Sequence, residues 1–168
     1  MYKYLVYFLI FSFLGWCAEV LFCAVKEGRY VNRGLARGPV CPIYGVGLCL
    51  CRFLLGSVKS APLLFLFSMS VATAVEFVTG VVSERITGRR LWDYGDIGGN
   101  ILGYVCPAFS VLWGLVCTLV LRALPLVDPY VTALEGPLGY TVFGVLFLLV
   151  LIDILFTSLK HRKMKNSV

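Results

Sequence analysis

The chain is organised around one polar stretch, which reads Asn32-Arg33-Gly34-Leu35-Ala36-Arg37-Gly38-Pro39-Val40-Cys41-Pro42-Ile43-Tyr44-Gly45. The sequence on either side of it is almost entirely Leu, Val and Phe. Glycine and proline mark tight turns, and arginine offers a planar set of donors that suits carboxylate or phosphate groups. We therefore predict a structured polar loop that lies between two membrane helices.

The composition of the chain indicates a membrane protein. Of the 168 residues, 60% are hydrophobic and only 14% are charged, whereas soluble domains carry about 25% charged residues. Several apolar runs approach or exceed the roughly 18–20 residues that cross a bilayer. We predict an all-α, multi-pass helix bundle of the plasma membrane, with a single domain over residues 1–168. The net charge of +6 requires no nucleic acid, because basic loops that face an anionic leaflet give the same excess.

Five transmembrane helices are predicted, because the apolar runs are continuous rather than alternating. The second run is short and contains Arg52. The first run contains Trp16 and Glu19 where a cleaved signal would need small residues, so we expect it to remain in the mature protein. The predicted spans cover about 4–25, 41–57, 61–84, 101–122 and 138–159.

The distribution of lysine and arginine predicts the orientation of these helices. Eleven of the fifteen basic residues fall on one side of the predicted spans and four on the other. The side that is rich in basic residues normally faces the cytoplasm. The N-terminus is therefore expected outside and the C-terminus inside, with both polar loops cytoplasmic. The four basic residues of the outer side are Lys3, Arg52, Lys59 and Arg122.

Three acidic residues, Glu19, Glu76 and Asp153, lie inside predicted spans. Each lies about 10–12 Å from the cytoplasmic end of its helix, at 1.5 Å per residue. An ionised carboxyl at a helix centre costs roughly 2–3 kcal/mol or more, so such side chains normally face the bundle interior. We predict that Glu19 and Glu76 face a shared interior, and a structural and a functional role both remain open for them.

Small and polar residues recur at spacings of three and four along the predicted helices, which is typical of helix–helix contacts in lipid. Packing alone would explain these positions, and a polar site would use the same faces. The stripes are Ser12, Gly15, Trp16 and Glu19; Thr73, Glu76, Gly80 and Ser83; and Ser110 with Gly114.

A second polar loop runs from Glu84 to Asn100 and contains Trp92-Asp93-Tyr94 among Arg and Gly residues. We expect Asn100 to be the N-cap of a helix that begins at residue 101. The two aromatic residues could lie at the membrane interface or stack on an arginine or a ligand. A shared polar site and a packed latch between the two loops both explain the pattern.

The candidate ligand-binding residues come from these loops and inner helix faces. No catalytic residue is assigned, and no cofactor is predicted. The cysteines lie mostly in apolar runs without a CxxC pair, and the one histidine is His161 in the basic tail. A zinc site is therefore not expected, and no metal-binding residue is assigned. The candidates are Glu19, Asn32, Arg33, Tyr44, Glu76, Glu84, Trp92, Asp93, Tyr94 and Asn100.

A weak internal repeat connects the two loops. Glu19 precedes Cys41-Pro42 by 22 residues, and Glu84 precedes Cys106-Pro107 by the same interval. In both halves a helix, a glycine-containing loop and a Cys-Pro pair follow one another. Parallel repeats of this kind occur in transporters, although two coincident pairs can also arise by chance. A parallel repeat of helix hairpins is one interpretation of the pattern.

Motifs over residues 8–115 resemble the bacterial putative ABC-transporter permease family, called CmpB-like or type IV. The resemblance rests on Phe13-Leu14-Gly15-Trp16, Glu19, Asn32-Arg33-Gly34, Gly38-Pro39, Cys41-Pro42-Ile43-Tyr44-Gly45, Glu76-Phe77-Val78-Thr79-Gly80, Glu84, Trp92-Asp93-Tyr94, Asn100, Gly103-Tyr104 and Trp113-Gly114. It implies a small multi-pass inner-membrane protein that acts as a transporter permease. The fifth predicted span carries no motif of this family.

The leading hypothesis is a permease subunit with a polar site on the cytoplasmic side. The chain lacks the G-x-x-x-x-G-K-[ST] motif, so a permease would need a separate ATP-binding subunit. The alternative is a membrane-embedded enzyme or binding protein that acts on a lipid or isoprenoid head group, with carboxylates as base and arginine as anion clamp. Membrane lipids and a second copy of the chain are further expected partners, and a non-enzymatic role is favoured.

Overall fold

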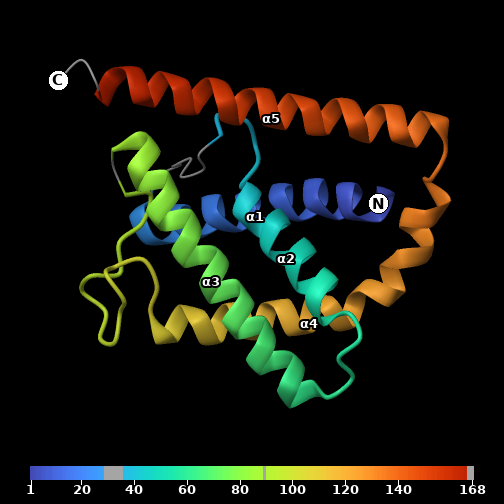
Figure 1. Cartoon of the computed structure of the whole chain (residues 1–168), viewed down its shortest axis with the longest axis horizontal. Helices are drawn as coiled ribbons and strands as arrows, with labels where there is room; N and C mark the ends of the chain where they lie inside the picture. Colours follow the sequence, from blue (N-terminus) through green and yellow to red (C-terminus); the bar gives the residue numbers. More distant parts are fainter. Residues whose placement is uncertain (29–35, 89, 166–168) are drawn as a thin grey trace.

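The computed structural model of the chain describes residues 1–28, 36–88 and 90–165 (Figure 1). Over these residues the secondary structure is helical, apart from one isolated bridge between Ile101 and Val105. This confirms the predicted all-α membrane bundle. The helices are α1 (Tyr2–Glu27), α2 (Pro42–Leu55), α3 (Ala61–Thr87), α4 (Pro107–Ala133) and α5 (Pro137–Lys165).

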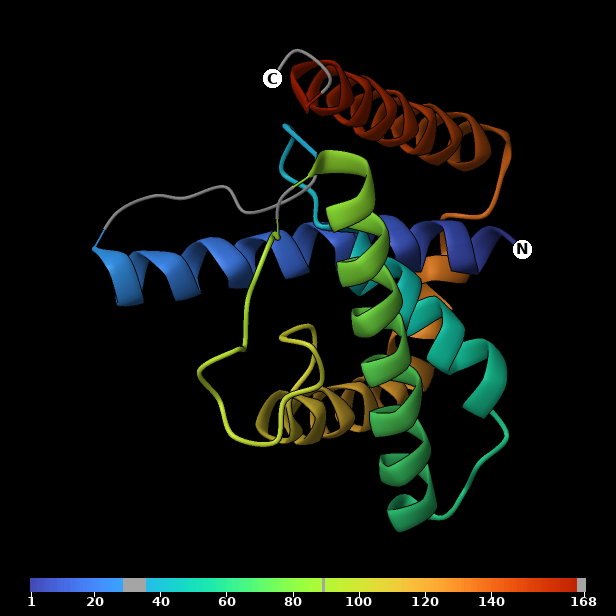
Figure 2. The same ribbon diagram turned by 60° about the vertical axis from the view of Figure 1, so that its left-hand side comes forward.

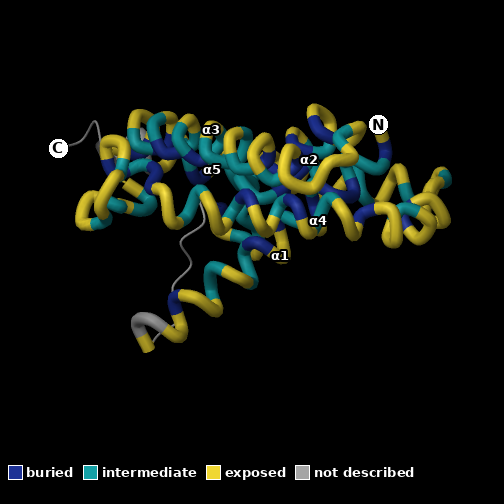
Figure 3. The backbone as a smooth tube through the Cα atoms, turned by 90° about the horizontal axis from the view of Figure 1, so that it is seen from below, coloured by how far each residue is buried: buried dark blue, intermediate teal, exposed yellow. Residues whose placement is uncertain are grey.

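Four helices are long and apolar enough to cross a membrane, namely α1, α3, α4 and α5. Only 11–22% of the positions in their most apolar windows are buried within the protein. Exposed apolar side chains cover the outside of the bundle, and the last turns of α1 extend away from the other helices (Figure 3). These surfaces therefore suit contact with lipid rather than with water.

The helix α2 is the exception, and it corrects the predicted full span over 41–57. It has 14 residues and a length of about 21 Å, which is less than the roughly 30 Å of a hydrocarbon core. Its start is fixed against the middle of α1, where the Cys41 N–H donates to the Ser12 carbonyl over 2.8 Å. The helix α2 is therefore a half-helix that begins at the level of the centre of α1.

In the view of Figure 1, α1, α5 and the first half of α4 run across the molecule and α3 crosses them steeply, whereas Figure 2 shows α5 inclined to α1. The ends of α1, α3 and α5 lie at the same end of the molecule as the start of α4, whereas the N-terminus lies at the other (Figure 1). The polar connection 88–106, which joins α3 to α4, therefore belongs to this end of the bundle, and α1 also ends there. We call this end the loop end and the opposite end the N-terminal end.

Glycine permits close helix contacts within both hairpins, α1 with α2 and α3 with α4. A Cβ atom added at Gly45 of α2 would lie 2.5 Å from the Phe8 carbonyl oxygen of α1. One added at Gly114 of α4 would lie 3.0 Å from the Met69 Cα of α3. The predicted stripes that contain Ser12 and Gly114 therefore lie at helix–helix contacts, where small residues are common in membrane proteins.

The two hairpins also begin and end alike, which extends the predicted repeat. Both α1 and α3 end at a glycine in the left-handed region, Gly28 with φ 65° and Gly88 with φ 75°. Both α2 and α4 begin with a cysteine at the N-cap and a proline in the first turn. The second hairpin thus repeats the first in its turn chemistry.

The predicted bounds of the fourth helix, 101–122, are wrong at both ends. The helix begins at Pro107, because Leu102 (φ 54°) and Gly103 (φ 76°) adopt left-handed conformations that a helix excludes. It continues to Ala133 through Pro125 and Pro129, and its second half turns away from the first (Figure 1). Proline bends a helix by removing a backbone donor, so the expected outer loop after residue 122 is mostly helical.

Candidate functional site

The segment 36–41 lies beside the centre of the bundle, where α1 and α5 satisfy its backbone. The Gly38 N–H donates to Asp153 Oδ2 of α5 over 2.9 Å, and Cys41 is bonded to Ser12 of α1. The Arg37 guanidinium lies 5.6 Å from the centre of the Phe156 ring of α5. Non-helical backbone at membrane depth needs such internal partners, so Asp153 binds the segment that leads into α2.

Glu19 of α1 is held by the first turn of α2. The Tyr44 hydroxyl donates to Glu19 Oε1 over 2.6 Å. The Tyr44 ring lies directly on Gly15, one turn before Glu19, where an added Cβ atom would clash with the ring. The Gly15-x-x-x-Glu19 pattern therefore positions one tyrosine, with glycine beneath the ring and glutamate at the hydroxyl.

Glu76 of α3 is the most enclosed acid of the membrane helices in the described residues, with a relative exposure of 6%. Its Oε1 atom accepts hydrogen bonds from the Tyr94 hydroxyl at 2.9 Å and from Trp113 Nε1 at 3.3 Å. Its Oε2 atom is buried and has no hydrogen-bond partner in the described part of the chain. A buried polar atom without a partner is costly and points to a missing partner.

Aromatic side chains connect the two acids. The Tyr44 and Trp113 rings meet edge to face with centroids 5.4 Å apart, and Tyr94 stacks on Phe109 at 4.7 Å. Burial raises the pKa of the Tyr94 hydroxyl most, and the negative charges of Glu76 and Glu19 raise it further. Both carboxylates therefore act on one phenol, which remains a donor at neutral pH.

We call Glu19, Tyr44, Glu76, Tyr94 and Trp113 the carboxylate–aromatic cluster. Its members come from α1, α2, α3, α4 and the loop before α4. Its members include two carboxylates and no cation. The three aromatic rings lie around these carboxylates. Carboxylates and aromatic faces are groups that attract cations, whereas the described residues hold no group of three metal-binding side chains.

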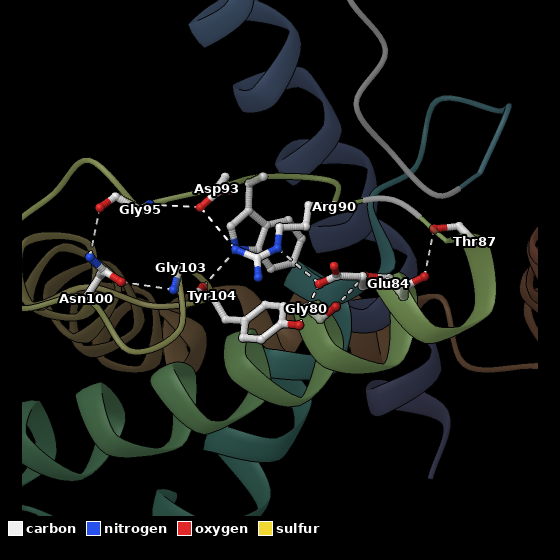
Figure 4. Close-up of polar contacts among 11 residues, drawn as sticks. Gly80, Glu84, Thr87, Arg90, Asp93, Gly95, Asn100, Gly103 and Tyr104 are labelled. Atoms are coloured by element: carbon white, nitrogen blue, oxygen red, sulfur yellow. Dashed lines mark hydrogen bonds and ion pairs between the residues drawn. The ribbon is translucent and has the colours of Figure 1, made fainter.

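The second loop forms a separate network around Arg90 (Figure 4). Arg90 Nε donates to Glu84 Oε2 over 3.1 Å, and Arg90 Nη1 donates to Asp93 Oδ1 over 3.2 Å. The guanidinium lies 4.8 Å from the centre of the Tyr104 ring, and the Tyr104 hydroxyl donates to Glu84 at 2.5 Å. The hydrogen bond to Glu84 raises the pKa of Tyr104, which keeps the hydroxyl protonated.

Asn100 closes the same loop, which corrects the expected N-cap. Its amide nitrogen donates to the carbonyls of Gly95 and Ile97 at 3.1 Å and 2.8 Å, and its oxygen accepts from Gly103 N–H at 3.0 Å. Trp92 Nε1 donates to the Tyr104 carbonyl over 2.9 Å. The side chain of Asn100 is thus used by the loop backbone, and Cys106 takes the N-cap position.

The Gly-x-x-x-Glu pattern recurs in this loop network. Gly80 and Glu84 of α3 hold Tyr104 as Gly15 and Glu19 hold Tyr44. A Cβ atom added at Gly80 would lie 2.8 Å from Tyr104 Cδ1. The resemblance between the two halves therefore includes a tyrosine contact that the 22-residue interval does not reveal.

The structure divides the ten candidate residues into three groups. Glu19, Tyr44, Glu76 and Tyr94 belong to the carboxylate–aromatic cluster, whereas Glu84, Trp92, Asp93 and Asn100 belong to the loop network. Asn32 and Arg33 lie outside the described residues. Trp113 was missing from the candidates, although the Trp113-Gly114 motif of the family resemblance contains it.

Comparison with known proteins gives one match. A model of the family described as putative ABC-transporter type IV matches residues 6–158. No curated protein and no solved structure matches the chain.

Proposed function

The chain belongs to the putative ABC-transporter type IV family, and on this premise we propose that it is a permease subunit. Its membrane helices and family identify a transporter-related membrane protein. We place the cargo site at the carboxylate–aromatic cluster, reached from the loop end. With the predicted orientation, the loop end faces the cytoplasm and the protein resides in the plasma membrane.

The observation that carries this proposal is the unpartnered oxygen of Glu76. The side chain is 6% exposed, and its Oε2 atom accepts no hydrogen bond in the described residues. An ionisable group inside a membrane helix is costly and typically belongs to a substrate or ion pathway. A cargo that donates a hydrogen bond or carries a positive charge would supply the missing partner.

The half-helix α2 supports the same location. Transporters commonly bind their substrates where membrane helices are interrupted, with the site at the interface between two repeats. The interrupted backbone at 36–41 leads directly to Tyr44, and the loop before α4 supplies Tyr94. The cluster thus lies where the two hairpins meet.

Transport by an ABC-type permease requires a separate ATP-binding subunit, because the sequence has no phosphate-binding loop of that type. We propose that this subunit docks at the loop end, where α1, α3, α4 and α5 all have an end. A pull-down of tagged full-length protein from mild detergent should retain a protein with that motif.

Inside-out membrane vesicles test transport directly. Vesicles that contain the protein and its co-purified partner are incubated with a metabolite extract, with and without ATP. We expect at least one compound to accumulate only with ATP, as measured by mass spectrometry. An extract lipid that changes mass without accumulation would instead support the enzyme that acts on a lipid head group. If neither result is observed, the permease proposal is contradicted.

Cysteine labelling tests the orientation. In a variant that lacks the seven native cysteines, we expect Glu135→Cys to react with an impermeant thiol reagent from outside the cell, because residue 135 is exposed between α4 and α5. Lys160→Cys, exposed near the end of α5, should react only after the membrane is opened. The reverse pattern would place the loop end outside.

A further inference from the structure

The four basic residues of the N-terminal end gather at one corner of the bundle. A pocket of about 650 Å³ lies there, between α1, α2, α4 and the start of α3. This volume is within the roughly 300–1,000 Å³ of small-molecule sites. We call it the outer basic pocket; its charged and polar lining consists of Arg52, Lys59, Arg122, Asp128 and Tyr4.

Asp128, the one acidic residue of the pocket lining, already pairs with basic residues. Arg52 Nη2 contacts both carboxylate oxygens of Asp128, at 2.9 Å and 3.0 Å. Lys3 Nζ lies 3.8 Å from Asp128 Oδ1, and the Tyr7 hydroxyl donates to the same oxygen. The Arg52 guanidinium also lies 5.0 Å from the centre of the Tyr7 ring. Asp128 therefore neutralises one charge while two cations compete for it.

The other two cations of the pocket have no acidic partner in the described residues. Arg122 Nη2 donates to the Lys59 backbone carbonyl over 2.5 Å, which fixes the guanidinium beside the connection between α2 and α3. Three cations against one acid give the lining a net charge of +2, and Lys3 adds one more. This excess of positive charge lies at the N-terminal end, where the sequence has only four of its fifteen basic residues.

We propose that the outer basic pocket binds a phosphate group. Guanidinium groups match phosphate oxygens with two donors each, and clustered charges at a low-dielectric wall concentrate anions. The phosphate could belong to a phospholipid of the adjoining leaflet or to a soluble compound on that side. The pocket is separate from the carboxylate–aromatic cluster, and its occupant does not depend on the permease proposal.

Two binding measurements on the full-length protein distinguish the sources. Calorimetry in detergent measures affinity for inorganic phosphate. Native mass spectrometry, after reconstitution in phosphatidylcholine with phosphatidylglycerol, measures retained phosphatidylglycerol. We expect Lys59→Gln/Arg122→Gln to weaken at least one of them about tenfold or more, because charge-assisted hydrogen bonds are the strong ones. Loss of phosphate binding alone assigns a soluble ligand, and loss of lipid retention alone assigns a head group.

The matched control is Lys160→Gln/Arg162→Gln, which removes the same two residue types at the other end of the molecule. It should leave both measurements unchanged. Asp128→Asn removes the one negative charge of the pocket lining, which raises its net charge by one, and this variant should bind phosphate more tightly. Circular dichroism and gel filtration verify the fold of each variant. Absence of both activities in the wild type, or equal losses in the pocket and control variants, would overturn the proposal.

Discussion

Vesicles with Glu76→Gln should lose ATP-dependent accumulation of the cargo by about 10- to 100-fold. A hydrogen bond to a charged group contributes about 1.5–3 kcal/mol, and each 1.4 kcal/mol is a factor of ten. The substitution removes the negative charge at Oε2, the atom that has no partner in the described residues. Uptake of the compound identified with the wild type measures the effect.

The same variant should fold as well as the wild type or better. The amide oxygen of glutamine can accept from Tyr94 and Trp113, as Glu76 Oε1 does. Removing a buried charge lowers the cost of its desolvation. Loss of transport with unchanged thermal stability therefore separates a functional from a structural carboxylate. Full transport by this variant would remove Glu76 from the cargo site.

Glu84→Gln is the matched control, because it changes the same residue type on the same helix. Glu84 accepts from Arg90 and Tyr104 within the loop network, and neither contact reaches the carboxylate–aromatic cluster. We expect transport within a few-fold of the wild type. An equal loss in both variants would indicate that the loop, rather than the buried acid, limits transport.

The sequence predicted the parts of the fold that depend on hydrophobic length. Continuous apolar runs identified α1, α3 and α5, and helix depth placed Glu19 and Glu76 at a similar level. Both acids then found aromatic donors in the interior. The prediction was possible because a carboxyl in a membrane helix needs an internal partner whatever the detailed packing.

The sequence failed where local backbone geometry outweighs hydrophobicity. Ile101, Leu102 and Val105 are apolar, yet Gly103 and Leu102 have positive φ and the helix begins only at Pro107. In the same way the fourth helix was predicted to end at residue 122, but α4 continues through Pro125 and Pro129 to Ala133. Apolar composition does not distinguish a loop that packs against helices from a helix.

The contacts between helices that are distant in the chain could also not be predicted from the sequence. Asp128 was expected in an outer loop, but it lies on α4 and binds Arg52 of α2. The signal was indirect, since an arginine in a short apolar run requires a counter-charge that the run itself does not contain. Which acid supplies it depends on the packing of α2 against α4, which no periodicity encodes.

Gly45→Ala should destabilise the protein by about 1–3 kcal/mol, the usual cost of inserting a methyl group into a packed interior. The new Cβ atom would lie 2.5 Å from the Phe8 carbonyl oxygen and 2.8 Å from Phe8 Cδ2, and it would also meet the Ser12 hydroxyl. Because the Phe8 oxygen belongs to the α1 backbone, α2 as a whole must move away. Unfolding of the detergent-solubilised protein by a denaturant series measures the change.

Gly144→Ala provides the control, because Gly144 lies within α5 and an added Cβ atom there meets nothing within 4 Å. Alanine is favoured over glycine in a helix interior by about 0.5–1 kcal/mol, so this variant should be as stable as the wild type or more stable. The displacement in Gly45→Ala also pulls Tyr44, the preceding residue, away from Glu19. Transport should therefore fall together with stability in Gly45→Ala and remain normal in Gly144→Ala. Equal stability of the two variants would mean that α1 and α2 are not packed through Gly45.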